Sequence, residues 1–503
     1  MLFNSFSFIL LFLPITLIGW FLLNKLENKS FADIFIIAMS LFFYSRFGVD
    51  IMLIMCASIV ANYVISAAMN QFNARAKVRA LKIIGIIVNL AFLFYFKYYD
   101  FFVGSAVEAL GMNYKSAQII MPIGISFYTF QQMSYIIDRG RGEAEHYSLI
   151  DYALYVTFFP KLIEGPIAFH EEILSQFKSP EKRIFNPENF QKGIILFVLG
   201  LSKKVLLADN LSLVVNYGFE QTFFLDTLTV IAVMLAYTFQ IYFDFSGYCD
   251  MASGIALMMN IELPINFNSP YKAATVKELW QRWHMTLSRF FVKYVYIPLG
   301  GSRKGKVRTV LNVLIVFVLS GLWHGAGWTY ICWGLMQGLL VVWDDIGIIA
   351  VEGSNKGKYL FRDEPLIKVP KIVGQFFTFT FFVISLFFFG ASDMTYAIGM
   401  FKRLFYFTYP GFLTRTASQL DLAENYVLSQ IISMVAPSFE NALYIATLII
   451  LLAICFFVNT RKNAYEIATS AKVTKKFTFG LAVLFIWSFI SLSQVSTFIY
   501  FQF

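Results

Sequence analysis

The sequence predicts a polytopic membrane protein built from α-helices. Of its 503 residues, 58% are hydrophobic and 14% are charged, whereas ordinary soluble domains carry about 25% charged residues. This much apolar surface exceeds what one soluble core can bury, because single cores stop growing near roughly 250–300 residues. The apolar runs are continuous over about 18–22 residues, the length of a membrane-spanning helix rather than of a barrel strand. A soluble enzyme, a disordered chain and a disulfide scaffold are therefore excluded.

Residues 1–145 contain five apolar runs that alternate with basic groups. The runs are Phe3–Leu23, Phe31–Tyr44, a third that ends near Met69, Ile83–Val103 and Ile119–Ile137. Basic residues follow the first, third and fifth runs, namely Lys25, Lys29, Arg75, Lys77, Arg79, Lys82, Arg139 and Arg141. Because cytoplasmic loops collect Lys and Arg, the N-terminus is expected outside. The first run lacks a basic n-region and a clear cleavage site, which favours a retained span over a signal peptide.

The segment Leu149–Ala168 differs from these spans because polar and helix-breaking residues interrupt it. It contains Pro160, Lys161, Glu164 and Pro166. Irregular backbone at membrane depth is tolerated only where protein or a water-filled cavity surrounds it, so a re-entrant or broken helix is predicted. Three further apolar runs follow, near Ile194–Tyr217, Leu225–Phe243 and Met251–Ile261.

The most basic stretch lies between Lys272 and Arg308 and is expected in the cytoplasm. The elements predicted after it are a hairpin of Thr309–Trp323 and Trp328–Trp343, a basic segment Lys356–Lys371, a span Ile372–Phe389, an outer stretch with a short surface helix, and spans Leu443–Val458 and Phe477–Leu492. About 11–13 helices should then enter the membrane, with the C-terminus outside. We expect one domain, 1–503, with N-terminal spans in 1–145, a core with both buried histidines in 146–346, and C-terminal spans with an outer aromatic tail in 347–503.

His324 is the most deeply placed ionisable candidate in the sequence. Sixteen residues separate it from Arg308, which corresponds to a rise of roughly 24 Å in a helix across a hydrocarbon core about 30 Å thick. Glycines stand close on both sides, at Gly321 and Gly325. An ionisable group at this depth is a functional candidate, and a neutral imidazole can act as a general base. The alternative is a histidine that hydrogen-bonds a neighbouring helix.

His284 lies in an aromatic and basic segment, Trp280–Ser288, which is typical of an amphipathic helix at the membrane interface. An anchoring helix and a functional histidine are equally open there. The two histidines are forty residues apart without an evident third ligand, and the four scattered cysteines show no C-x-x-C spacing, so no metal site is predicted.

Three further groups carry weaker signals. Asp244 and Asp250 border an apolar run, where they can cap helices, orient a histidine or pair with Lys203 and Lys204. The glycine-rich loop before Arg308 carries Arg303, Lys304 and Lys306, whose cations and neighbouring amides could hold the phosphates of a donor; a plain basic loop is the alternative. The last residues, Phe498–Phe503, form an aromatic cluster that also suits an interface belt.

These blocks, taken in order, resemble the membrane-bound O-acyltransferase (MBOAT) family, and within it the branch of bacterial alginate O-acetylation membrane proteins. The resemblance is carried by blocks in the central part of the chain: Phe158–Ile167, Asp244–Ala252, Trp280–Ser288 with Tyr296–Gly301, and Ser320–Ala326. Proteins of lipoteichoic acid D-alanylation and of cell-wall O-acetylation are relatives. The resemblance implies a ring of helices around a thin centre, with a cytoplasmic funnel that meets an outer cavity.

The resemblance also implies a chemistry. His324 matches the family's invariant histidine and His284 its second histidine. The donor is expected to be acetyl-CoA, and the acetyl group is expected on an extracytoplasmic polysaccharide, passed on by a separate SGNH-type transferase. Phe498, Tyr500 and Phe503 match a terminal motif implicated in receiving the acyl group. The hypothesis is that His324 removes the phenol proton of Tyr500, which otherwise has a pKa near 10, while His284 positions the donor or stabilises the oxyanion.

Other functions remain open at this point. A transporter or flippase for a glycan or lipid precursor would explain the helices and buried polar groups, although corresponding broken segments in two halves are not evident. A scaffold for an assembly complex would tolerate replacement of both histidines. Within the acyltransferases, D-alanyl transfer to teichoic acid is the alternative reaction. The expected location is the bacterial cytoplasmic membrane.

Overall fold

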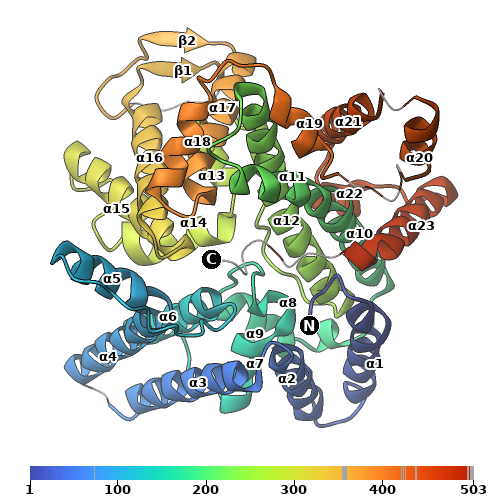
Figure 1. The fold of residues 1–503 in the computed structure, drawn as a ribbon. Coiled ribbons are helices and arrows are strands. Elements are labelled where there is room, and N and C mark those ends of the chain that lie inside the picture. The colour runs from blue at the N-terminus through green and yellow to red at the C-terminus, as the bar shows by residue number, and fades with distance from the viewer. Residues whose placement is uncertain are drawn as a thin grey trace.

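The computed structural model describes residues 1–72, 74–353, 359–420, 422, 424, 426–436, 439–494 and 498. Helices make up nearly all of its regular structure (Figure 1). The exception is a short parallel pair of strands, β1 (Ile349–Val351) and β2 (Ile367–Val369), which the sequence did not lead us to expect. The prediction of a helical, polytopic membrane fold is confirmed.

The five predicted N-terminal runs all form helices. These are α1 (Leu13–Leu23), α2 (Ser30–Ser45), α3 (Val49–Asn70), α4 (Arg75–Leu93), α5 (Tyr99–Ala109) and α6 (Ile125–Arg141). A π-helical turn, Phe94–Tyr98, joins α4 to α5, so the fourth run is one interrupted rod. This turn carries Lys97, whose contacts are described with the candidate site below.

The segment with Pro160 is broken, as predicted. Its pieces are α7 (Leu149–Thr157) and α8 (Phe159–Leu162), with Phe158 between them in a non-helical conformation. The helices that follow are α9 (His170–Lys178), α10 (Pro187–Ser202), α11 (Asp209–Glu220) and α12 (Thr227–Met258). Lys161 is fully buried in the broken segment and donates a hydrogen bond to Gln131.

Helix α12 corrects the expected break between two apolar runs. It continues for 32 residues through Asp244 and Asp250, so neither carboxylate caps a helix. Lys204 Nζ lies 2.6 Å from Asp244 Oδ1, and Lys203 Nζ lies 2.6 Å from Asp250 Oδ2. These ion pairs offset the desolvation of each carboxylate and let the helix pass without interruption.

The remaining elements complete the ring of helices. They are α13 (Val276–Arg282), α14 (Met285–Phe291), α15 (Lys306–His324), α16 (Trp328–Ile346), α17 (Lys371–Gly390), α18 (Met394–Arg403), α19 (Gly411–Ala417), α20 (Tyr426–Val435), α21 (Glu440–Thr460), α22 (Ala464–Ser470) and α23 (Lys475–Ile490). Figure 1 shows α3–α6 in the lower part of the view and α15–α17 in the upper part, with α14 between the two groups and α12 near the middle of the molecule. The predicted hairpin is present as α15 and α16.

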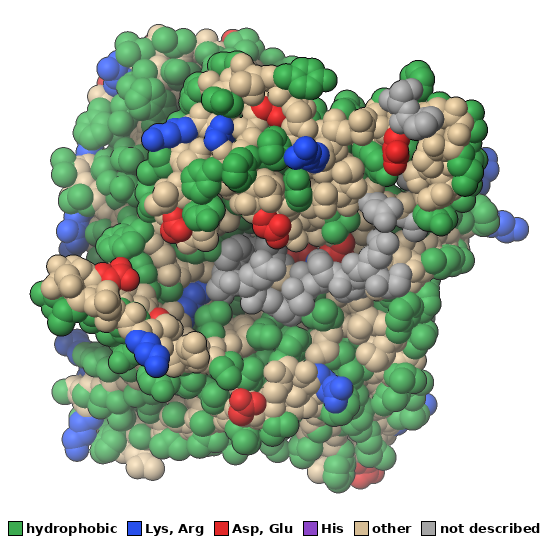
Figure 2. All heavy atoms as spheres, in the orientation of Figure 1, with side chains coloured by type: hydrophobic (Ala, Val, Ile, Leu, Met, Phe, Trp, Pro, Cys, Tyr) green, Lys and Arg blue, Asp and Glu red, His purple; other side chains and the backbone are tan. Residues whose placement is uncertain are grey.

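Six helical segments of the described chain are long and apolar enough to cross a membrane. They are Val49–Asn70, Arg75–Ala109, Thr227–Met258, Lys306–His324, Lys371–Gly390 and Glu440–Thr460. Figure 2 shows hydrophobic side chains over most of the margin of the molecule, as a lipid-facing surface requires. The most buried of the six is α12, with 78% of its apolar window inside the protein, against 17% for Arg75–Ala109. Helix α12 is therefore the helix most enclosed by others among these six candidate spans of a multi-pass membrane protein.

Glycines bring α10 and α12 into backbone contact. A Cβ added at Gly200 would lie 2.6 Å from the carbonyl oxygen of Gly247, and one added at Gly193 would lie 2.6 Å from that of Gly254. Small residues at helix interfaces allow such close approach in membranes. The contact fixes the lysines that follow α10 against the carboxylates of α12.

We expect Gly200→Ala to destabilise the protein, because the new methyl group meets backbone atoms that cannot rotate away. Overpacking of this kind costs about 1–3 kcal/mol. The measurement is the thermal unfolding temperature in detergent. Gly480→Ala is the matched control, since nothing lies within 4 Å of a Cβ at that helical position. Equal unfolding temperatures for the two variants would contradict the proposed contact.

Candidate active site

His324 is the last residue of α15 and lies inside the protein, with 2% of its surface exposed. Its ring is surrounded by aromatic rings, with centroids 5.2 Å from Trp333 and 5.3 Å from Phe389. A Cβ at Gly321 would lie 2.2 Å from the carbonyl oxygen of Tyr330. The glycines near this histidine therefore allow α16 to pack directly against the end of α15.

His284 corrects the expectation of a continuous interface helix. Helix α13 ends at Arg282 and α14 begins at Met285, and His284 lies between them at φ 44° and ψ 50°. This left-handed conformation is uncommon for a residue other than glycine. The side chain is fully buried. The interpretation of the segment as a surface anchor is therefore wrong, because the kink turns the histidine inward.

Asn266 holds the His284 ring and defines which nitrogen carries the proton. Its Oδ1 accepts hydrogen bonds from the amide and the hydroxyl of Thr286, and lies 3.1 Å from His284 Nδ1. Since an amide N–H can only donate, Oδ1 is an acceptor, and Nδ1 of His284 must donate to it. In a neutral imidazole, Nε2 is then the acceptor. It has no hydrogen-bond partner within the described chain.

The fold brings the two predicted histidines together. Their ring centroids are 6.2 Å apart, although forty residues separate them in the chain. Phe127 and Trp323 also contact the ring of His284, with centroid distances of 6.3 and 5.6 Å. The two imidazoles lie in one buried region lined by aromatic rings, which is called the chamber below, and imidazoles can accept and return a proton.

Lys97 anchors the end of the helix that carries His324. Its Nζ donates to the carbonyl oxygens of Trp323 at 2.6 Å and of His324 at 3.2 Å, and lies 3.2 Å from Ser126 Oγ. A cation at a helix C-terminus satisfies the carbonyl groups left free there. Sequence reasoning missed this residue, although a lone lysine within the aromatic run of the fourth span was a signal.

A buried ionic cluster lies beside the chamber. Lys204 Nζ contacts Asp209 at 2.7 Å and Asp244 at 2.6 Å. The ring of Phe498 lies over the same ammonium at 4.4 Å and meets the ring of Tyr248 edge-on at 5.0 Å. Phe498 is thus buried beside the ionic cluster. Tyr500 and Phe503, the other two members of the predicted motif, lie outside the described residues.

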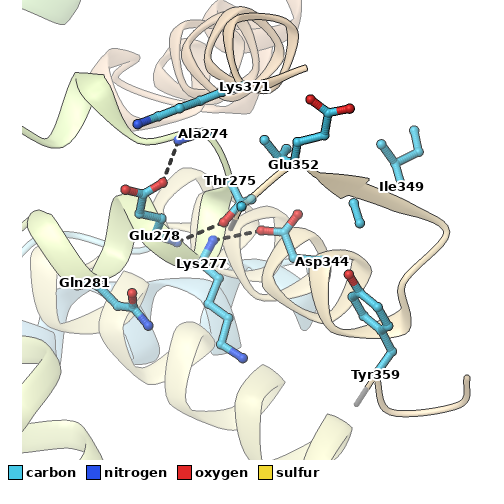
Figure 3. A pocket seen from close by; sticks show the side chains of 13 residues that line it. Ala274, Thr275, Lys277, Glu278, Gln281, Asp344, Ile349, Glu352, Tyr359 and Lys371 are labelled. Atoms are coloured by element: carbon cyan, nitrogen blue, oxygen red, sulfur yellow. Dashed lines mark hydrogen bonds between the residues drawn. The ribbon is translucent and has the colours of Figure 1, made fainter. Parts of the chain in front are cut away.

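The predicted donor-phosphate residues Arg303, Lys304 and Lys306 are exposed and precede α15 or begin it. A pocket of about 390 Å³ lies nearby, between α13, the end of α16, β1 and the start of α17 (Figure 3). Described residues that line it include Lys277, Lys371 and Asp344, and none of the three predicted residues is among them. The Lys277 amide donates to Asp344 at 2.8 Å.

The geometry defines an integral membrane protein with a buried two-histidine centre. The family model of the membrane-bound O-acyltransferases matches residues 36–347, which include both histidines. The chain belongs to the membrane-bound O-acyltransferase family, and it is an O-acyltransferase. The family prediction made from its motifs is thereby confirmed.

Individual relatives differ in what their names say they modify. A peptidoglycan O-acetyltransferase of Helicobacter pylori is 35% identical over 100% of this chain and 98% of its own length. A probable alginate O-acetylase of Pseudomonas syringae is 36% identical over 81% of this chain and 76% of its own length. A teichoic acid D-alanyltransferase of Streptococcus thermophilus is 29% identical over 52% of this chain and 66% of its own length.

Proposed function

We propose that the protein is a membrane O-acetyltransferase that moves an acetyl group from cytoplasmic acetyl-CoA toward an extracytoplasmic polysaccharide. The observation that carries the proposal is the contact between the His324 and His284 rings in a buried chamber. The full-length similarity to a peptidoglycan O-acetyltransferase supports acetyl as the group and a glycan as the final acceptor.

In the proposed reaction, His324 is the general base. The attacking hydroxyl, which we assign to Tyr500, forms a bond to the thioester carbonyl carbon as its proton passes to His324. The carbon–sulfur bond then breaks, and the imidazolium returns the proton to the leaving sulfur. The products are an aryl acetate and a free thiol, and the histidine ends neutral, so protons and electrons balance.

Two roles were expected for His284, positioning the donor or stabilising the oxyanion. Its hydrogen bond to Asn266 favours the first of them. With Nδ1 engaged as a donor, a neutral His284 offers only the Nε2 lone pair to the chamber. Stabilising an oxyanion would require a donor at this atom. We therefore assign His284 to positioning, in which Nε2 accepts a hydrogen bond from a donor amide or from the attacking hydroxyl.

The position of Phe498 supports the assignment of Tyr500. Tyr500 follows Phe498 by two residues in the chain, and the ring of Phe498 lies over the Lys204 ammonium. Phe498 touches Tyr248, and Tyr248 adjoins Cys249, whose neighbour Asn266 holds His284. This series of contacts connects the described end of the tail with the residue that holds His284.

The two faces of the protein receive different partners in this proposal. Arg303, Lys304 and Lys306 hold the phosphates of the donor at the cytoplasmic face, and both chain termini lie on the opposite face. There an SGNH-type transferase collects the acetyl group and delivers it to the glycan. The core with both histidines is assigned to 146–346, between the N-terminal spans of 1–145 and the C-terminal spans of 347–503.

The function is tested by transfer of label in proteoliposomes. Protein reconstituted with acetyl-CoA labelled in the acetyl group is expected to release free thiol and to acquire label. A D-alanyl carrier thioester, offered in parallel, is expected to give no transfer. Transfer from the D-alanyl donor alone would replace the proposed reaction with D-alanylation. Absence of thiol release with either donor, from protein that remains folded, would exclude both.

A further inference from the structure

Glu164 is a buried carboxyl group to which the proposed reaction has so far given no task. It follows α8 in the broken segment, and 2% of its surface is exposed. Neither of its carboxyl oxygens has a hydrogen-bond partner in the part of the chain that the structure describes. Burying such a group without a partner costs several kcal/mol, so its retention calls for an explanation in function.

The carboxyl group lines a small cavity that it shares with His324. The cavity has a volume of about 50 Å³, and Lys97, Ser126 and Trp323 also line it. Since roughly 10–15 Å³ of such space admits one water, the cavity has room for water. A water there would find the two to four polar partners that a buried water needs.

Two glycines set the position of Glu164 against the cavity. A Cβ at Gly165 would lie 2.3 Å from the Cα of Lys161, so the chain turns tightly just after the carboxylate. Gly124 adopts φ +73°, and a Cβ there would lie 3.0 Å from the Cα of Ile163. The start of α6 and the end of the broken segment are thus packed backbone to backbone beside Glu164.

We propose that Glu164 is a positioning residue that acts on His324 through a water in this cavity. One imidazole N–H donates to the water, and the water donates to the Glu164 carboxylate. The other imidazole nitrogen then faces the chamber as the base. The arrangement resembles the carboxylate and histidine of an acyl-transfer triad with one water inserted. Glu164 neither gains nor loses a proton, since the transferred proton passes from hydroxyl to histidine to sulfur.

The charged groups near Glu164 and His324 determine how the rate of the reaction should depend on pH. Lys97 and His284 are the titratable neighbours of His324, and Tyr330 of α16 packs against the adjacent glycine. Asp244 and Lys204 of the ionic cluster are the charged neighbours of Glu164. Lys204 is paired with Asp244, so His284, Lys97 and, in this proposal, Glu164 are the groups whose removal should affect the His324 imidazole most directly.

Glu164→Gln is the decisive variant, because it keeps the shape of the side chain and removes its charge. This inference rests on the proposed function. The turnover number is expected to fall about 10–100-fold, the usual lower range for assistance to a general base, with an unchanged KM for the donor. The acidic limb of the pH–rate profile should move to lower pH, since the imidazolium loses a nearby anion. The unfolding temperature should not fall, because the carboxylate has no hydrogen bond to a described residue to lose.

Two further variants test whether Glu164 positions His324 or only stabilises the fold. Glu164→Asp keeps a carboxylate that a second water can reach, and it should recover part of the lost turnover. Glu143→Gln, at an exposed carboxylate, should leave both profile and turnover unchanged. A Glu164→Gln protein with full turnover, or with a lower unfolding temperature and an unmoved pH profile, would overturn the inference. If His324 variants were inactive in the same assay, the proposed function would still stand.

Discussion

Replacing His324 with alanine is expected to lower acetyl transfer by about 10²–10⁴-fold, the range for loss of a general base. The physical reason is that an unaided phenol or sugar hydroxyl is almost entirely protonated at neutral pH. Nδ1 of His284 is committed to Asn266, and the proposed reaction uses the lone pair of His284 Nε2 for positioning, so His324 is the base that the substitution removes. The measurement is thiol release from the donor thioester in proteoliposomes at saturating donor.

A second substitution at His324 distinguishes loss of the base from loss of the fold. His324 packs among Trp333 and Phe389, so alanine leaves a hole in an aromatic cluster, whereas His324→Gln fills much of it. Both variants should be inactive, and glutamine should retain the wild-type unfolding temperature more closely. His146→Ala, on the loop before α7, serves as the control and should remain active. Full transfer by a folded His324→Gln protein would remove the general-base assignment.

The sequence predicted the parts of this site that depend on local pattern. The hairpin of α15 and α16 and the broken segment at Pro160 follow from hydropathy and from proline. These features need only a few neighbouring residues. The family resemblance added the pairing of His324 with His284, which no spacing rule could supply.

What sequence reasoning missed depends on contacts between distant segments. His284 turns inward because Asn266, eighteen residues earlier, stabilises a left-handed kink, whereas the local pattern is equally typical of a surface helix. Helix α12 runs on through Asp244 because Lys204 neutralises it. His170, the first residue of α9, is also buried, and it lies 3.3 Å from Asp138. In each case a tertiary partner overrides the local preference.

Changing Tyr500 to phenylalanine is expected to abolish delivery of acetyl groups to the glycan while leaving the aromatic tail in place. The substitution removes one hydroxyl and keeps the ring, so the apolar packing of the tail changes little. In the proposed relay this hydroxyl is the nucleophile, and its loss removes the covalent intermediate altogether. Mass spectrometry of the C-terminal peptide from protein incubated with donor should show an acetyl adduct on Tyr500 in the wild type and none in the variant.

The relay and the histidine chemistry can be separated by combining variants. Tyr409→Phe, at a tyrosine that is 90% exposed, is the matched control and should leave both adduct and glycan acetylation intact. The adduct should also disappear in His324→Gln, because the base acts before the intermediate forms. A Tyr500→Phe protein that still acetylates the glycan would exclude the relay. In that outcome the acceptor hydroxyl belongs to the glycan or its carrier and must itself reach the chamber, and His324 keeps its role.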